Sequence, residues 1–542
     1  MQRKKLIFTG GHILTMAENK TAEAILVEDS KITFVGGFQK CKKQAISNYE
    51  IINLEGKTLI PGFVDCHTHP FMFGMCKIWA DVSYPKVQCI EDLISVLKEH
   101  SRNLPAAAPI RGFGFDQRRL KELRYPTAQD LDRVAIDRPV QIMHVSGHCN
   151  VCNTFLLRSI GVTDDAEDSV GGSFGRDENG KPNGPLWDSA NDLLAGESGV
   201  KPGNHGPNIH MPDSLENLMK QLKVAQENFL GVGITTVNEI QLTKQELNAY
   251  LAARDSGILK LRVEMSFLSN YLDEVIDLGF NATFGDDKLT IGSIKFYSDA
   301  SLLSGTANLS SGYIDSEKKG YYYHQNQELI DLLIKAHING LQTCTHAQGD
   351  IAIEAVIQAV EQAQKIYPRN DMRHRIEHCG LPTEEQCKRI AKLDIYPVLQ
   401  TEMNYLYGDG VLNAVGVDVA VNYSPTAWFK KYGVNFILSS DAPVTTPNPM
   451  EAVHAAVSRK TILNNVLGAH QAVSIDDALK AYTITAAKGC RREKIAGSIE
   501  EGKLADFAVL NANPYDFEDK IDEIRNIKVL ETWINGEKVF ER

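Results

Sequence analysis

The stretch PGFVDCHTH, residues 61–69, decides the fold of this chain, because an apolar run there ends in two histidines. On a β-strand, residues two apart point to the same side, so His67 and His69 can face one point. Two neutral imidazoles that face one point form half of a site for Zn²⁺ or a similar divalent metal. Taken alone, the pair is weak support, since chance or a surface location also explains it.

Seven further strand-like runs follow and alternate with helical stretches, a rhythm typical of βα units around a parallel sheet. Eight strands are the number that a (β/α)₈ barrel requires. We therefore predict an α/β fold built on a (β/α)₈ TIM barrel. The eight expected strands are Gly62–His67, Ile234–Glu239, Leu261–Phe267, Thr290–Tyr297, Leu341–His346, Arg373–His378, Ile395–Gln400 and Asn435–Ser440.

Three more metal-binding side chains recur at the ends of these strands: His346, His378 and Asp441. Barrel enzymes place their catalytic groups at the C-terminal ends of the strands. Any one of the three could instead be a core histidine or, for Asp441, a helix cap. Because His346, His378 and Asp441 all lie at the same end of one barrel as residues 67–69, the sequence predicts a metal centre at that end.

Lys295 lies inside an apolar strand, where a lysine is almost never fully buried unless it is paired. An ammonium beside metal ions would be disfavoured by repulsion and desolvation, whereas the carbamate formed from the neutral amine and CO₂ would be an anionic ligand. The alternative is a structural lysine that pairs with Asp299 or Glu239, and spacing alone favours that alternative.

The two ends of the chain read as one β-rich module of short strands, with Asn535-Gly536 as a hairpin turn. Because neither end can close a core alone, we expect residues 1–58 and 495–542 to form a discontinuous β-sandwich domain. Residues 59–494 then form the barrel. The interval of about 71–212 is too long for a βα connection and is expected to be an inserted subdomain over the barrel mouth.

The 542 residues include 57 Lys and Arg against 69 Asp and Glu, and the net charge of −12 argues against a nucleic-acid-binding surface. The N-terminal apolar run, Leu6-Ile7-Phe8, is too short for a signal-peptide core, and no apolar run approaches the length of a membrane span. Ten cysteines in so long a chain do not indicate a disulfide framework. We expect a cytoplasmic protein that acts on a small molecule and binds neither nucleic acid nor membrane, with a homodimer as one option.

The ordered motifs resemble those of the amidohydrolase superfamily, and specifically its YtcJ-like branch (amidohydrolase family 3), which includes N-substituted formamide deformylase. The segments that carry the resemblance are PGFVDCHTH (61–69), VSGH (145–148), IKFYSD (294–299), THAQGD (345–350), HRIEH (374–378) and SDAP (440–443). The resemblance implies one or two divalent metals, Zn²⁺ first among them. It further implies that the ligands are His67, His69, His346, His378 and Asp441, with Lys295 as a carboxylated bridge.

This sequence departs from the branch at positions near the expected pocket. Many relatives have Asp-Gly where this chain has Asp299-Ala300, and Glu where Asp188 stands. Residues 149–153 also differ from an alanine-rich stretch. The substrate is therefore not carried over from the resemblance.

We hypothesise that metal-activated water cleaves a C–N bond of a small non-peptide amide or formamide. Asp441 would act as the general base, and His148 would assist the developing oxyanion. Aromatic side chains that could contact the substrate are Phe113, Trp187 and Tyr297. The alternatives are a lactone, ester or phosphotriester hydrolase with the same centre, or a metal-binding regulatory protein without catalysis.

Overall fold

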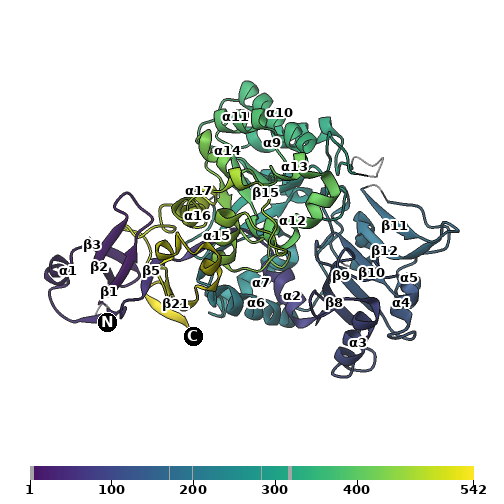
Figure 1. Cartoon of the computed structure of the whole chain (residues 1–542), viewed down its shortest axis with the longest axis horizontal. Coiled ribbons are helices and arrows are strands. Elements are labelled where there is room, and N and C mark those ends of the chain that lie inside the picture. The colour runs from purple at the N-terminus through teal and green to yellow at the C-terminus, as the bar shows by residue number, and fades with distance from the viewer. Residues whose placement is uncertain (1–4, 170, 198, 282, 315–319) are drawn as a thin grey trace.

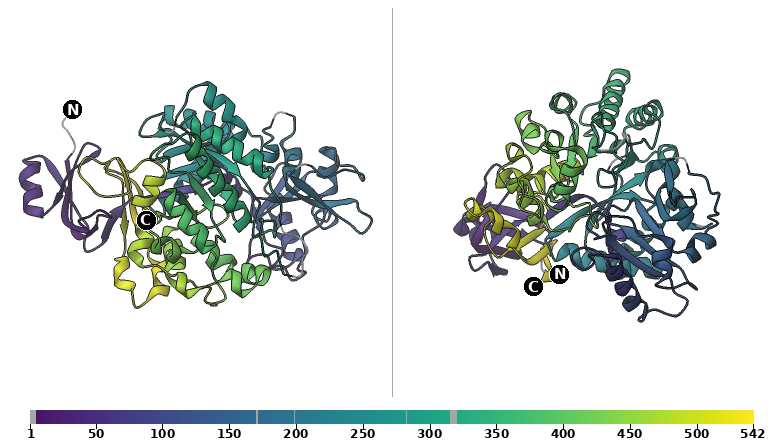
Figure 2. Two further views of the ribbon diagram at one scale, coloured as in Figure 1. Left: turned by 90° about the horizontal axis from the view of Figure 1, so that it is seen from above. Right: turned by 45° about the vertical axis from the view of Figure 1, so that its right-hand side comes forward.

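The computed structural model describes residues 5–169, 171–197, 199–281, 283–314 and 320–542, so residues 1–4 of the expected N-terminal module lie outside the described residues. Three sheets account for the architecture. A sheet built from both chain ends lies on one side, the barrel lies in the middle, and a sheet from residues 80–188 lies on the other side (Figure 1). The views in Figure 2 keep this order.

The central sheet is a parallel barrel of eight strands in the order β19-β18-β17-β16-β15-β14-β13-β6, which confirms the predicted TIM barrel. The meeting point of its first and last strands carries a hydrogen bond from Asp441 N to His67 O at 2.8 Å. The strands are β6 (Phe63–Thr68), β13 (Ile234–Leu242), β14 (Arg262–Leu268), β15 (Leu289–Tyr297), β16 (Gln342–Ala347), β17 (Arg375–His378), β18 (Tyr396–Leu399) and β19 (Ile437–Leu438).

Helices connect these strands and cover the barrel, and several start where the sequence supplies a cap. Thr243 and Thr383 each form a capping box with the residue three positions on, which fixes the starts of α7 and α11. The connecting helices include α6 (Leu215–Leu230), α7 (Lys244–Asp255), α8 (Leu272–Asp277), α9 (Asn326–Ile338), α10 (Asp350–Ile366), α11 (Glu384–Lys392), α12 (Thr401–Val415), α14 (Thr426–Lys431), α15 (Pro449–Ser458), α16 (Ile475–Ala481) and α17 (Ile484–Gly489).

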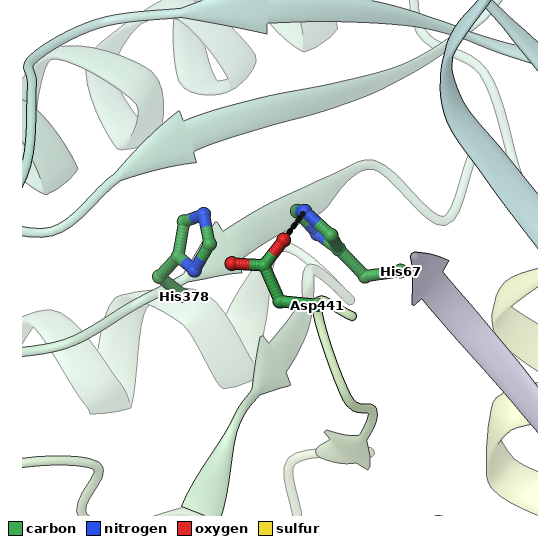
Figure 3. A group of neighbouring side chains, drawn as sticks. All are labelled: His67, His378 and Asp441. Atoms are coloured by element: carbon green, nitrogen blue, oxygen red, sulfur yellow. Dashed lines mark ion pairs between the residues drawn. The ribbon is translucent and has the colours of Figure 1, made fainter. Parts of the chain in front are cut away.

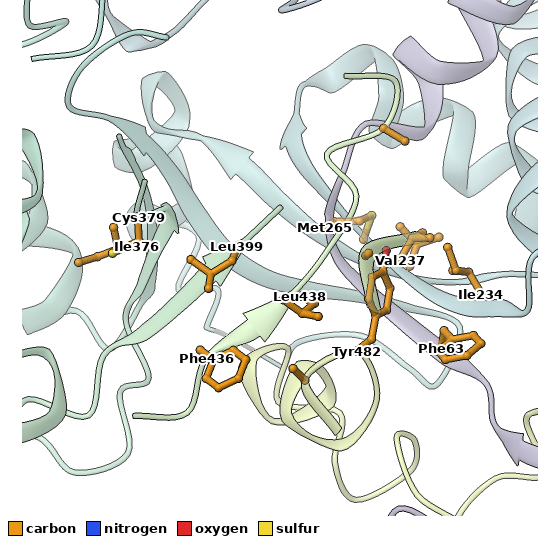
Figure 4. Packing of buried hydrophobic residues seen from close by; sticks show 14 of the residues in the cluster. Phe63, Ile234, Val237, Met265, Ile376, Cys379, Leu399, Phe436, Leu438 and Tyr482 are labelled. Carbon is orange, nitrogen blue, oxygen red and sulfur yellow. The ribbon is translucent and has the colours of Figure 1, made fainter. Parts of the chain in front are cut away.

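In the hydrophobic core of the barrel, side chains from the strands pack against side chains from the surrounding helices and their connections. Phe63, Val237 and Leu438 come from three strands, and Tyr482 follows α16 and packs edge-on against Phe63 with ring centroids 6.0 Å apart (Figure 4). All four side chains are buried. Close packing of this kind holds the strands rigidly, which fixes the positions of the side chains at their ends.

The terminal sheet contains strands from both ends of the chain in the order β22-β21-β20-β5-β1-β2-β3, with β4 beside β1. Its seam is the antiparallel pair β20 and β5, in which Phe507 lies opposite Pro61. This sheet is the additional β domain that the two ends were expected to build. Its strands are β1 (Lys5–Leu14), β2 (Thr21–Glu28), β3 (Lys31–Gly36), β4 (Tyr49–Asn53), β5 (Thr58–Pro61), β20 (Phe507–Leu510), β21 (Val529–Ile534) and β22 (Glu537–Glu541).

A buried ion pair ties the terminal sheet to the barrel. Arg262 of β14 donates to both carboxylate oxygens of Asp506, at 2.6 and 3.0 Å, and both side chains are almost fully buried. The domain boundaries at residues 58/59 and 494/495, and the extent of the insertion at 71–212, stay predictions.

The third sheet follows α2 (Pro70–Ile78) and has the order β11-β12-β10-β9-β8-β7. The connection between β9 and β10 carries His148 toward the barrel. Its strands are β7 (Ala80–Asp81), β8 (Ile110–Phe115), β9 (Val140–His144), β10 (Cys149–Cys152), β11 (Gly172–Arg176) and β12 (Pro182–Asp188). A membrane-spanning helix, judged by length and apolar character, is not found anywhere in the described ranges.

Candidate metal centre

Three of the predicted ligands converge at the C-terminal mouth of the barrel. His67 ends β6, His378 ends β17 and Asp441 follows β19, and one ligand atom from each lies within 4.8 Å of the others. Figure 3 shows their side chains directed at one another, with Asp441 on the loop after β19. Asp441 Oδ1 is 3.3 Å from His67 Nε2 and 3.2 Å from His69 Nε2. A buried set of imidazole nitrogens and a carboxylate fits a divalent metal of the Zn²⁺ type.

A buried carboxylate fixes the ring of His67. Glu377 Oε2 lies 2.5 Å from His67 Nδ1, and Arg375 binds Glu377 through two nitrogens at 2.7 and 3.0 Å. Burial alone would raise the pKa of Glu377, but the charge of Arg375 and the bond from His67 hold it below its usual range. A carboxylate accepts the Nδ1 proton, so Nε2 is left unprotonated and turned toward the centre.

An amide fixes the ring of His378 in the same way. His378 Nδ1 is 2.6 Å from Gln400 Oε1, and Gln400 Nε2 donates to Ser439 Oγ at 2.9 Å. Burial lowers the pKa of His378 to about 3, which keeps the ring in the neutral form that binds metal. Both His378 and Asp441 have left-handed backbone, with φ of 69° and 56°. Such strained residues concentrate at functional sites, where the surrounding structure enforces them.

His69 and His346 line the same small cavity of about 30 Å³ as His67, His378 and Asp441. The ring centroid of His346 is 4.3 Å from that of His378, and its Nε2 is 3.1 Å from the carbonyl oxygen of Ala300. Neither His69 nor His346 belongs to the group of three whose ligand atoms lie within 4.8 Å of one another.

Lys295 is fully buried on β15, and its Nζ lies 4.6 Å from the centroid of the Tyr297 ring. Within the described ranges its Nζ has no hydrogen-bond partner and no ion pair with Asp299 or Glu239. Asp299 accepts instead from backbone amides such as Gln348 N, and Glu239 from the hydroxyl of Tyr250. Burial lowers the pKa of Lys295 to about 8, so an appreciable fraction of the amine is neutral near neutral pH.

His148 reaches the metal cavity from the inserted sheet and is held by a carboxylate. Its Nδ1 is 2.6 Å from Asp188 Oδ1, which also accepts the hydroxyl of Tyr323 at 2.6 Å. The backbone of Asp188, with φ of 53°, donates to His148 O at 2.8 Å. Because Asp188 accepts the Nδ1 proton, Nε2 is the nitrogen that His148 presents to the cavity.

The three aromatic residues expected at the substrate lie in different places. Tyr297 lines the metal cavity and donates its hydroxyl to Gln241 Oε1 at 2.8 Å. Phe113 lines a second, larger cavity beside it. Trp187 packs against Tyr125 in the core of the inserted sheet, with ring centroids 5.2 Å apart, and lines neither of these two cavities as far as the structure describes them.

Sequence reasoning missed the residues that orient the ligands: Glu377, Gln400 and Tyr323. A signal was present for one of them, because Arg375-Ile376-Glu377 places two charges on one face of a buried strand, where charges must be paired. Gln400 and Tyr323 carry no such signal.

Comparisons with known proteins agree with this geometry. A sequence profile of the amidohydrolase family matches residues 50–540. The chain is 27% identical to the N-substituted formamide deformylase of Arthrobacter pascens, over 100% of this chain and 99% of that protein. It is 28% identical to the putative amidohydrolase YtcJ of Bacillus subtilis (strain 168), over 99% of this chain and 100% of that protein.

A similar solved structure is that of an uncharacterised metal-dependent hydrolase from Pyrococcus horikoshii OT3. It superimposes with a TM-score of 0.76 at 26% sequence identity, and the match covers 94% of this chain and 98% of that one. The protein from Pyrococcus furiosus with the same description gives a TM-score of 0.74 at 25% identity.

Proposed function

The chain belongs to the amidohydrolase family, and we propose that it cleaves a C–N bond of a small non-peptide amide or formamide with one or two divalent metal ions. The observation that carries the proposal is the convergence of His67, His378 and Asp441, with Glu377 and Gln400 orienting the two rings. The relative that is named a formamide deformylase supports the choice of substrate class. Zn²⁺ is the first candidate metal, because it prefers nitrogen and carboxylate ligands in this combination.

The residues that would hold the metal are His67, His69, His346, His378 and Asp441, with Lys295 as a carbamate bridge. A bound divalent metal lowers the pKa of water from 15.7 to about 7 and polarises a carbonyl group. The neutral Lys295 amine attacks the carbon of CO₂ and releases one proton, which leaves an anionic carbamate. Its burial without a partner among the described residues supports this assignment.

Asp441 is the group that would move the proton. The carboxylate accepts a proton from the attacking water and returns it to the leaving nitrogen, so that the amine departs neutral. Its position supports that role, because Oδ1 lies 3.3 Å from His67 Nε2 and 3.2 Å from His69 Nε2, among the nitrogens that would hold the metal.

His148 would stabilise the oxygen on which negative charge develops, as a hydrogen-bond donor. That task needs a proton on Nε2, the nitrogen that faces the cavity, while Asp188 holds the ring at Nδ1. The buried Tyr323 hydroxyl fixes the Asp188 oxygen from the other side.

The proposal includes a cytoplasmic location. It also includes a surface that binds no nucleic acid, in agreement with the net charge of −12.

Replacement of Asp441 by Asn tests the assignment of the base. Asn keeps the volume and one oxygen but cannot accept the proton, so hydrolysis of an amide should fall by about 10²- to 10⁴-fold at preserved metal content. An activated ester should lose less, because its leaving group needs no proton. Initial rates on both substrates, with metal measured by atomic absorption, give the comparison.

Two outcomes would change the proposal. Little loss on either substrate, with metal retained, would remove Asp441 as the base. In the wild-type protein, faster turnover of lactones or phosphotriesters than of amides would replace the C–N bond as the target.

A further inference from the structure

A second cavity of about 490 Å³ lies directly beside the metal cavity of about 30 Å³. Most of its lining comes from α2, from residues 79–84 and 113–119 of the inserted region, from α12 and from the loop after Asp441. The lining side chains include Trp79, Tyr84, Phe113, Arg119, Tyr407 and Val444.

The two cavities adjoin along a boundary at which neighbouring residues face one cavity or the other. Neighbouring residues of the same segment line opposite sides: Val145 the large cavity and Ser146 the metal cavity. On α12, Met403 lines the metal cavity and Tyr407, one turn later, the large one. Val444 lines both cavities, so the two cavities meet at this residue.

Two hydrogen bonds hold Val444 at this boundary. Tyr407 donates its hydroxyl to Val444 O at 2.8 Å, and Val444 N donates to Asp441 O at 2.8 Å. The position of Val444 is therefore tied to the position of Asp441. A group in the large cavity would lie against the same loop that carries the proposed base.

The difference in volume separates the roles of the two cavities. The metal cavity of about 30 Å³ is much the smaller of the two, so it suits the reacting end of a substrate better than a large substituent. The large cavity falls within the range of about 300–1,000 Å³ that is usual for sites of small organic ligands. A bulky substituent of the substrate therefore fits the large cavity better.

The lining of the large cavity combines aromatic faces with two cations, Lys77 and Arg119, and two carboxylates, Asp81 and Asp116. The Arg119 guanidinium carbon lies 5.0 Å from the centroid of the Tyr84 ring, and one of its nitrogens donates to Leu406 O at 2.5 Å. No carboxylate of the described residues forms an ion pair with Arg119, since Asp116 is bound by two nitrogens of Arg118 at 2.9 and 2.8 Å. Arg119 keeps unused donors in a fork that suits a planar anion.

We propose that this cavity binds the larger group on the scissile C–N bond, and that this group is aromatic with a carboxylate or similar anion bound by Arg119. The inference rests on the proposed amide hydrolysis and adds the substrate class to it. Trp79, Tyr84 and Phe113 supply the faces against which a planar ring packs. Val444 marks the boundary between the reacting end and the recognised end of the substrate.

The test compares two formamides that share a phenylethyl group on nitrogen, one with and one without a carboxylate in the para position. Formamides carry only hydrogen on the carbonyl carbon, so the nitrogen substituent is the only large group. The wild-type, metal-loaded protein should prefer the carboxylated compound in kcat/KM. Arg119→Met should lower the ratio of the two kcat/KM values by about 10- to 100-fold, which is typical for a hydrogen bond to a charged group.

Arg119→Lys should retain part of the ratio, because it keeps the charge but not the fork. Arg158→Met, at an exposed position on α5 (Thr154–Ser159), is the matched control and should leave the ratio unchanged. Thermal melting of each variant identifies any that fails to fold. Binding of both compounds measured by isothermal titration calorimetry should show the same preference and its loss in Arg119→Met.

The two hypotheses fail in different ways. Equal binding and turnover of the two compounds by the wild-type protein, or a ratio that Arg119→Met leaves unchanged, would overturn the second-cavity proposal while hydrolysis stands. Preferential binding of the carboxylated compound without any turnover would support the cavity and count against the proposed amide hydrolysis.

Discussion

Gln400 offers a sharp test of how this centre is held, because its neutral amide connects the ring of His378 to the hydroxyl of Ser439. Its Oε1 lies 2.6 Å from His378 Nδ1 in a fully buried environment. In Gln400→Met, a side chain of similar size keeps the packing, but the Nδ1 proton loses its acceptor. The ring is then free to rotate or to adopt the other tautomer, in which Nε2 carries the proton and cannot bind metal.

Two independent estimates give the expected loss of metal affinity in Gln400→Met. A buried donor left without a partner costs about 1–3 kcal/mol. Loss of a partner that orients a metal-bound histidine typically weakens metal affinity or activity about 10- to 100-fold, and a tenfold change corresponds to about 1.4 kcal/mol. We therefore expect Gln400→Met to weaken metal binding by about 10- to 100-fold.

Competition with a chromophoric chelator measures the metal affinity directly. Gln400→Glu, which restores an acceptor for Nδ1, should bind metal more tightly than Gln400→Met. Gln358→Met on the exposed side of α10 is the matched control, since among the described residues that side chain bonds only to Glu354. Metal affinity within threefold of wild type in Gln400→Met would refute the role assigned to this hydrogen bond.

Three further predictions concern other parts of the molecule. Asp188→Asn should lower kcat for an amide by about 10²-fold with little change in KM, because Asn no longer offers a charged acceptor to His148 Nδ1. Asp188→Glu should recover part of kcat, and equal losses in both variants would indicate a purely structural role. Crystals of the metal-loaded protein should show extra density on Lys295 Nζ, and a bare amine pointing away from every metal would remove the bridge. Arg262→Met should destabilise the fold by about 3–5 kcal/mol in denaturant unfolding, because it leaves the buried Asp506 charge unpaired. Lys335→Met, which breaks an exposed pair, should cost under about 1 kcal/mol, and similar losses in both variants would contradict the argument.

The sequence by itself determined the barrel and the general position of the centre. Strand-like runs and helical periodicity depend on local spacing, and all eight predicted strands are present within a few residues of their predicted limits. Parallel strands in a barrel bring their C-terminal ends to one mouth, so His67, His378 and Asp441 had to meet once the strands were assigned. The assignment needed no knowledge of side-chain contacts.

The tertiary structure alone decided how the site is oriented and bounded. His67 is fixed by Glu377, 310 residues away, and Asp188 is fixed by Tyr323, 135 residues away. Such contacts leave no periodicity in the sequence, because each depends on how separate elements pack. The same reason explains Trp187, which was expected at the substrate and lies in the core of the inserted sheet. The large cavity beside Val444 likewise exists only because α2, α12 and the inserted sheet meet over one barrel mouth.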